Sequence, residues 1–134
     1  MSVRTALRIE LANRPGELAK ALKPIAQANV NLHAAAALAG AESGLVALLP
    51  SNPASAASAL QRAGVSARAV AVVVTWLPNR PGTLLKACEI LASAGIKIEG
   101  LCVVSTDPAQ GVQITFECSD AERADHLLAD ASVY

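Results

Sequence analysis

Asn13-Arg14-Pro15-Gly16 is repeated as Asn79-Arg80-Pro81-Gly82, 66 positions further along the chain. When residues 13–32 are shifted by 66 positions, nine of the twenty residues are identical and no gap is needed. Internal similarity at a fixed spacing indicates a duplicated structural unit. The sequence therefore predicts two similar modules, which we place at residues 1–70 and 71–134.

Each repeat has the hydrophobic pattern of a small module of strands and helices. Residues 3–11 alternate apolar and polar side chains, which is typical of a half-buried strand. Residues 18–25 then carry apolar side chains at helical spacing. We expect this helix to begin at Pro15 and to be kinked or shortened by Pro24.

The order of the predicted elements favours an α+β, ferredoxin-like βαββαβ fold. With right-handed crossovers, this order gives an antiparallel sheet with both helices on one face. A short strand at residues 66–70 should close the first module and lead into residues 71–77, the first strand of the second. The last helix should end near Ala131, so the second module should lack most of its last strand. An open sheet edge invites pairing, and we therefore expect a homodimer.

The composition argues against several classes of protein. Eleven basic residues balance eleven acidic ones, and aromatic residues make up 2%, so the charge and the stacking surfaces of a nucleic-acid-binding protein are missing. The cysteines at 88, 102 and 118 are odd in number and widely spaced, which favours a reducing compartment over a disulfide framework or a zinc site. The N-terminus lacks a signal-peptide pattern, and the apolar run at 69–77 is about half a membrane span. We expect a cytoplasmic protein that binds neither nucleic acid nor membrane.

Catalytic motifs are also missing from the sequence. No Cys/His pair, serine elbow or carboxylate pair stands out at a spacing that chemistry would use. We therefore expect no catalytic residue, no metal and no cofactor, and we predict that the protein is not an enzyme.

The repeated loop has properties that suit a small zwitterionic ligand. The start of a helix presents unsatisfied N–H groups and the positive end of a dipole, which favour a carboxylate. Gly16 and Gly82 lack a Cβ atom, so a ligand can approach the backbone closely. The Asn side chain offers both a donor and an acceptor. These features predict an amino-acid-like ligand at one or both loops.

The motif Asn-Arg-Pro-Gly-x-Leu after a strand resembles the ACT domain family. The segments Ala-Asn-Val-Asn-Leu at 28–32 and Ala-Gly-Ile-Lys-Ile at 94–98 are similar to the family's passage from helix to strand. The resemblance implies a regulatory module that binds amino acids at interfaces between paired domains and that serves enzymes of amino-acid metabolism. We expect a stand-alone tandem ACT protein.

Serine-sensing members of the family bind their ligand through the loop Asn and an Asn at the start of the second strand. These positions correspond to Asn13 and Asn31 in the first repeat and to Asn79 and Lys97 in the second. The ligand-binding His of those members is Leu in both repeats, so serine is not expected as the ligand. The candidate ligand-binding residues are Asn13, Arg14, Gly16, Glu17, Leu18, Asn31, Asn79, Arg80, Gly82, Thr83, Leu84 and Lys97.

Two hypotheses for the function remain open on the sequence. The first is a regulatory protein that senses an amino acid or related metabolite, and the alternative is a structural protein that assembles with itself or an enzyme subunit without ligand. Asn31 and Lys97 are each either ligand contacts or solvated residues, and Lys97 as a contact would favour an acidic ligand. Of the two loops, the sequence favours the one at Asn13, because its module is complete.

Overall fold

The computed structural model describes residues 2–130 and divides them into two compact units. The N-terminal unit is Thr5–Val70, and the C-terminal unit consists of residues 71–130 together with residues 2–4. The elements are β1 (Ser2–Ala12), α1 (Glu17–Gln27), β2 (Leu32–Ala39), β3 (Ser43–Pro50), α2 (Pro53–Arg62), β4 (Ala67–Leu77), α3 (Thr83–Ser93), β5 (Ile98–Asp107), β6 (Gly111–Cys118) and α4 (Ala121–Asp130).

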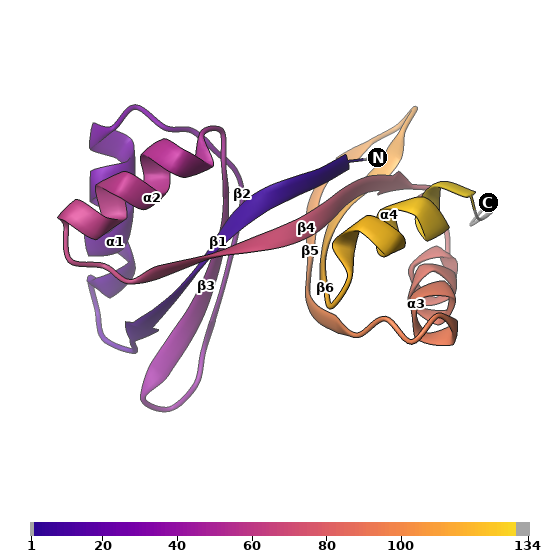
Figure 1. Ribbon diagram of the computed structural model, residues 1–134, viewed down its shortest axis with the longest axis horizontal. Coiled ribbons are helices and arrows are strands. Elements are labelled where there is room, and N and C mark those ends of the chain that lie inside the picture. The colour runs from indigo at the N-terminus through magenta and orange to yellow at the C-terminus, as the bar shows by residue number, and fades with distance from the viewer. Residues whose placement is uncertain (1, 131–134) are drawn as a thin grey trace. The chain divides into compact units, whose positions relative to one another are not determined.

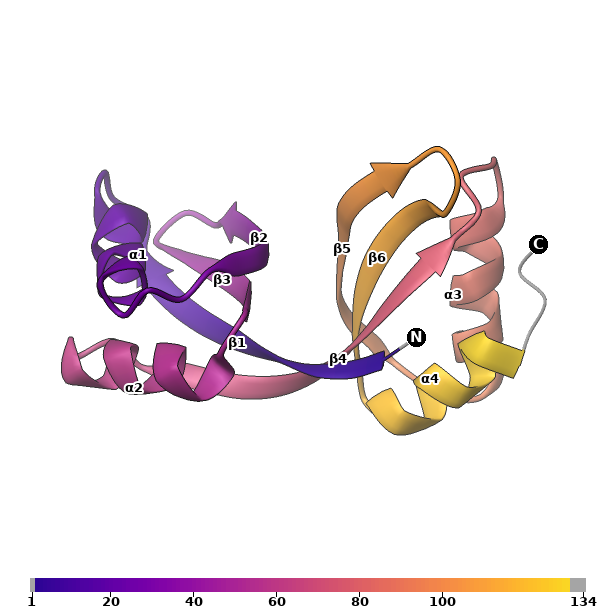
Figure 2. The same ribbon diagram turned by 90° about the horizontal axis from the view of Figure 1, so that it is seen from above.

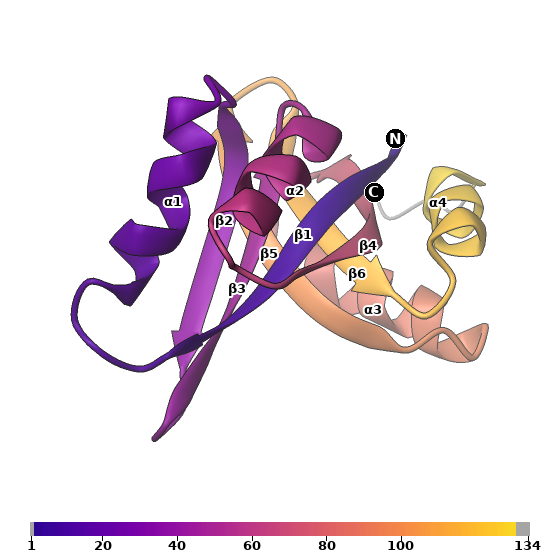
Figure 3. The same cartoon turned by 60° about the vertical axis from the view of Figure 1, so that its left-hand side comes forward.

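The N-terminal unit has the strand order β2-β3-β1-β4, the order of a ferredoxin-like sheet. Leu7 on β1 lies opposite Leu48 on β3 in the antiparallel register. Both side chains are 1% exposed and pack with Ile25 of α1 and Leu60 of α2. Helices α1 and α2 therefore cover the same face of the sheet, as Figures 1 and 3 show.

The C-terminal unit repeats this plan in the order β1-β4-β6-β5. Its core joins Val73 of β4 and Phe116 of β6 to Leu91 of α3 and Leu128 of α4. Figure 2 shows both helices on one side of β4 and β6. The α+β fold predicted from the repeat is confirmed in both units.

Strands β1 and β4 each contribute to both units, which the sequence did not indicate. Residues 2–4 of β1 belong to the C-terminal unit, where Val3 packs against the core. The described residues contain no strand after α4, and the start of β1 occupies the place of the fourth strand. A strand of 11 residues is longer than one small sheet requires, so its excess length is free to pair elsewhere.

Two expectations about the sheet are therefore corrected. The two short strands predicted at 66–70 and 71–77 are one continuous strand, β4. The open edge expected beside β4 is filled, because β4 lies between β1 and β6, and the edge strands are β2 and β5. The stub of a last strand predicted after Ala131 falls outside the described residues.

The first helix of each unit begins later than expected. The helices start at Glu17 and Thr83, after a Pro-Gly turn whose glycines have φ of 86° and 87°. Glycine is needed here because a side chain disfavours this left-handed backbone conformation. Pro24 does not end α1, which continues to Gln27. The cost of Pro24 is offset because the helix face at Ile25 is buried.

Within residues 2–130, no helix is both long and apolar enough to cross a membrane.

Candidate functional site

The two Asn-Arg-Pro-Gly loops have nearly the same backbone hydrogen bonds. Lys20 N–H donates to Gly16 O at 2.9 Å, and Lys86 N–H donates to Gly82 O at 3.0 Å. The Arg14 N–H donates to Ala12 O at 2.9 Å, and the Arg80 N–H donates to Pro78 O at 3.0 Å. The duplication therefore extends to the local geometry of the loop backbone, and the two loops differ in what each of them contacts.

In the first loop, the polar side chains are engaged within their own unit. Asn13 Nδ2 donates to Gly40 O at 2.9 Å, and the Asn13 backbone N–H donates to Glu42 O at 3.0 Å. Arg14 Nη2 lies 3.2 Å from Glu17 Oε1 and forms an ion pair with it. The two bonds of Asn13 hold the loop against the turn between β2 and β3, and the ion pair with Glu17 compensates the charge of Arg14.

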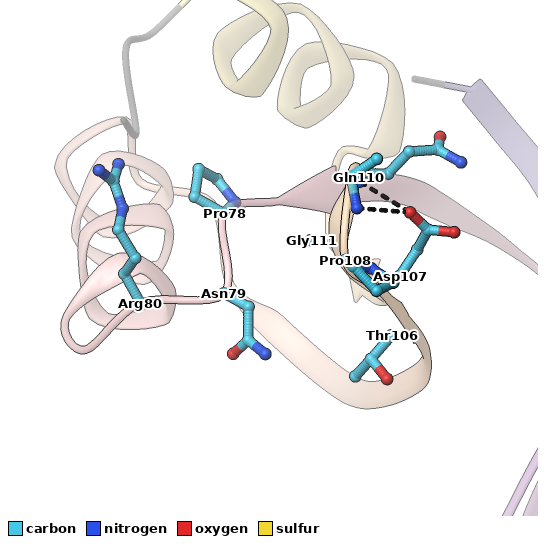
Figure 4. Close-up of a pocket in the computed structure, with 9 residues that line it drawn as sticks. Pro78, Asn79, Arg80, Thr106, Asp107, Pro108, Gln110 and Gly111 are labelled. Atoms are coloured by element: carbon cyan, nitrogen blue, oxygen red, sulfur yellow. Dashed lines mark hydrogen bonds between the residues drawn. The ribbon is translucent and has the colours of Figure 1, made fainter.

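In the second loop, the corresponding side chains are free to bind something else. Among the described residues, neither the Asn79 amide nor the Arg80 guanidinium has a hydrogen bond or ion pair, and Thr83 stands where the first repeat has Glu17. The turn between β5 and β6 is closed instead by Asp107. Its Oδ1 accepts from Ala109 N–H at 2.8 Å and from the next amide at 3.0 Å (Figure 4).

Grooves border both loops. An open groove of about 720 Å³ lies between the second loop and the β5–β6 turn, with Asn79 and Arg80 on one side and Thr106 and Asp107 on the other (Figure 4). A second groove, of about 300 Å³, has a mostly apolar lining and shares Asn79 and Arg80 with the first. The first loop borders a smaller groove, of about 230 Å³, whose lining includes Glu17. The second loop therefore offers more room and an unpaired cation.

Asn31 lies far from Asn13 within the same unit. The start of β2 pairs with Pro50, whereas its end, Ala39, pairs with Gly44 beside the end of β1. Eight strand residues span about 25 Å, so these two asparagines are at opposite ends of the sheet. Asn31 exchanges hydrogen bonds with Ser51, the N–H to Oγ at 3.0 Å and the carbonyl with the amide at 2.7 Å.

Lys97 is placed in the same way in the C-terminal unit. Its N–H donates to Ser119 Oγ at 3.0 Å, and its carbonyl accepts from Ser119 N–H at 2.9 Å. This is the end of β5 remote from Asp107 and from the loop at Asn79. Within one unit, the structure therefore does not bring the loop asparagine and the residue that starts the second strand into one site.

The other candidate residues lie at the grooves or in the turns. Glu17 and Leu18 line the groove of the first loop, and Thr83 and Leu84 line the apolar groove of the second. A Cβ atom on Gly16 or Gly82 would meet nothing within 4 Å. The positive φ of these glycines, rather than close packing, therefore explains why glycine is needed there.

The residues of the β5–β6 turn are not among the candidates predicted from the sequence. Thr106 and Asp107 reach the second loop because β6 begins beside the end of β4, where Leu77 pairs with Val112. Asp107-Pro108 is a turn-forming pair in the sequence, but which loop this turn lies beside depends on a pairing between distant strands. Hydrophobic periodicity does not reveal which turn will lie beside which loop.

The cysteines of the C-terminal unit are partly buried and free. Burial raises the pKa of the Cys118 thiol from 9.0 to about 11, and Glu117, Cys88 and Glu99 add to the rise. A thiol that stays protonated is a poor nucleophile. No cluster of three or more His, Cys, Asp or Glu side chains that could hold a metal ion occurs among residues 2–130.

Comparisons with known proteins place this geometry in a family. Protein BT0572 from Bacteroides thetaiotaomicron is similar in structure, with 26% identity, a TM-score of 0.83 and coverage of 96% of this chain and 88% of that one. The ligand-free regulatory subunit of aspartate kinase from Thermus thermophilus has 20% identity, a TM-score of 0.69 and 98% coverage of both chains. The corresponding subunit from Thermus flavus has 18% identity, a TM-score of 0.61 and coverage of 96% and 95%.

No curated protein matches the sequence. The model of the ACT domain pair family matches residues 1–133, almost the full length of the sequence. Both units have the antiparallel sheet, with both helices on one face, that the order of the predicted elements implied. The chain therefore belongs to the ACT domain pair family.

Proposed function

We propose that this chain is a regulatory protein, not an enzyme, and that it senses an amino acid or a related metabolite at the loop of Asn79 and Arg80. The observation that carries the proposal is the contrast between the loops. The first loop uses its asparagine and arginine in bonds to Gly40 and Glu17, whereas the second leaves both side chains unbonded beside two grooves. This proposal replaces the preference for the loop at Asn13.

The chemistry of the second loop supports recognition of a carboxylate. The Arg80 guanidinium has donors in a fixed fork that matches a carboxylate with two parallel bonds. The Asn79 amide adds one donor and one acceptor within the same groove. A ligand with a carboxylate and a second polar group satisfies both side chains.

A second copy of the chain completes the proposed assembly. Asn31 and Lys97 lie at the ends of their sheets that are remote from the loop of the same unit, so neither reaches a ligand at that loop from within the unit. The strands at the two sheet edges are β2 and β5, and β2 contains no Asp, Glu, Lys or Arg. An edge strand such as β2 is suited to pairing, whereas β5 carries Glu99 and Asp107. We propose a homodimer on this basis.

The alternative function is assembly without a ligand, and one observation favours it. Leu38 is 81% exposed and Leu45, its partner across the β2–β3 ladder, is 53% exposed. Exposed apolar patches are common at protein interfaces. A protein that assembles through this patch but binds no ligand would be a structural subunit.

The proposed partner is an enzyme of amino-acid metabolism. Two proteins of this fold with solved structures are regulatory subunits of aspartate kinase. We propose a comparable role for this chain by analogy of fold. We place that role in the cytoplasm, because the cysteines of the described residues are free and suit a reducing compartment.

A thermal-shift panel of amino acids tests the ligand proposal. A ligand that binds only the folded state stabilises it by about 2.7 kcal/mol at one hundred times its dissociation constant. We expect at least one amino acid to raise the melting temperature, and Asn79→Ala to reduce that shift. Asn13→Ala is the matched control and should preserve it. A panel without any shift would favour the assembly alternative, and a shift lost only in Asn13→Ala would move the site to the first loop.

A further inference from the structure

We infer that the ligand of the second loop is a small aliphatic carboxylate whose carboxylate pairs with Arg80 and whose side chain enters the apolar groove beside the loop. This inference rests on the proposed function, because it specifies the ligand of the same loop. Aliphatic amino acids and their 2-oxo acids share this chemistry, and the experiment below separates them.

The groove combines one cationic residue with an apolar floor. Its volume is about 300 Å³, at the lower end of the range for small-molecule sites. Polar groups of Asn79, Arg80, Thr83 and Thr106 lie among its lining residues. The remaining lining is almost entirely apolar and includes Leu77, Leu84, Val103, Val112 and Ile114.

Two of the apolar lining residues are unusually exposed for their position. Val103 on β5 lies opposite Ile114 of the core and therefore on the helix-covered face, yet its side chain is 54% exposed. Leu84, in the first turn of α3, is 38% exposed. An aliphatic ligand that covers these two side chains removes apolar surface from water, and this burial favours binding.

The charges of the groove determine which ligands it rejects. Arg80 is the only charged residue among the lining residues. A second charge on a ligand side chain would lose its hydration in the apolar part without gaining a partner. The groove therefore discriminates against both acidic and basic amino acids, which differs from the acidic ligand that a Lys97 contact would favour.

The groove of the first loop lacks this property although it is lined by apolar residues. Glu17 lines that groove and pairs with Arg14, so no unpaired cation remains and a carboxylate is already present. A ligand carboxylate would have to compete with Glu17 for the guanidinium. The replacement of Glu17 by Thr83 in the second repeat removes this competition.

The experiment measures binding to the full chain by calorimetry, with L-leucine, L-valine, 4-methyl-2-oxopentanoate, 3-methylbutylamine, L-aspartate and L-lysine as probes. We expect leucine, valine or the 2-oxo acid to bind at least about tenfold more tightly than aspartate and lysine, a difference of about 1.4 kcal/mol. The amine, which lacks the carboxylate, should bind at least about tenfold more weakly as well. A preference between the amino acids and the 2-oxo acid shows whether the ammonium group contributes.

Two pairs of variants locate the site. Arg80→Gln should weaken binding at least about tenfold, whereas Arg14→Gln should leave it unchanged. Val103→Asp introduces a carboxylate into the groove and should weaken binding similarly. Leu45→Asp is the matched control, because Leu45 lies in the groove of the first loop and is almost as exposed (53%), and it should leave binding unchanged. Circular dichroism confirms that each variant is folded.

The outcomes distinguish this inference from the proposed function. Tighter binding of aspartate or lysine that depends on Asn79 would overturn the inference and leave the function standing. Binding of leucine that is insensitive to both Arg80→Gln and Val103→Asp would overturn the assignment of the groove. If no amino acid binds at all, including those of the wider thermal-shift panel, the ligand-sensing function itself fails.

Discussion

The hydrogen bond between the Asn13 side chain and the β2–β3 turn leads to a sharp prediction about stability. Asn13→Ala removes the bond from Nδ2 to Gly40 O, which is 2.9 Å long and lies at the surface. A bond between neutral groups contributes about 0.5–1.5 kcal/mol, and an exposed carbonyl regains water when its donor is lost. We therefore expect the free energy of unfolding to fall by about 0.5–1 kcal/mol.

Asn79→Ala is the control, because it makes the same chemical change in the same loop motif. The Asn79 side chain has no such bond within the described residues, so the change should stay within about 0.5 kcal/mol. The assay is equilibrium urea unfolding followed by far-UV circular dichroism. Fluorescence of the single tryptophan, Trp76, reports on β4 of the C-terminal unit and should be affected less by Asn13→Ala.

Amide hydrogen exchange can show which part of the fold loses stability in Asn13→Ala. Asn13→Ala should speed exchange of the residue 13 amide, which donates to Glu42 O at 3.0 Å, because the loop and the turn are no longer held by the side chain. Equal destabilisation by Asn13→Ala and Asn79→Ala would refute the reasoning that only the first loop is fastened. So would an unchanged stability of Asn13→Ala.

Three further predictions test the packing of the C-terminal unit. Gly111→Ala should lower the free energy of unfolding in urea by about 3 kcal/mol or more, because a Cβ atom at this residue, whose φ is 100°, would overlap the backbone carbonyl of Leu77. Gly16→Ala is the control and should cost about 1–2 kcal/mol, because Gly16 has a similar φ of 86° but open space around it. Equal losses in the two variants would contradict the clash at Gly111. Val3→Asp should destabilise the C-terminal unit, measured by Trp76 fluorescence, because it puts a charge against that unit's core; an unchanged midpoint would argue against the shared strand. Alkylation of Cys118, with the other cysteines replaced by serine, should still accelerate between pH 9 and 11, because burial raises the pKa of this thiol to about 11. The same raised pKa means that the folded state holds this proton more tightly, so its contribution to stability is complete below pH 9 and is lost as the pH rises to about 11.

The sequence by itself determined the features that depend on neighbours along the chain. The repeat of Asn-Arg-Pro-Gly predicted two similar units, and the periodicities predicted the order of their strands and helices. The first helices are followed by left-handed residues, Asn29 at a φ of 59° and Gly95 at 73°, and both residue types favour this conformation at the end of a helix. The Arg14–Glu17 pair is also local, since its two residues lie three positions apart on either side of the Pro-Gly turn that precedes α1.

Only the tertiary structure decided which parts of distant segments meet. The Asn13 amide finds its acceptor at Gly40, 27 residues away, and no local pattern distinguishes it from Asn79. The exchange of β1 and β4 between the units depends on strand pairing across more than sixty residues. Strand alternation shows which face is buried but does not identify the neighbouring strand. The Asn-Arg-Pro-Gly repeat can therefore be identified from the sequence, whereas the difference between its two copies depends on contacts that exist only in the folded chain.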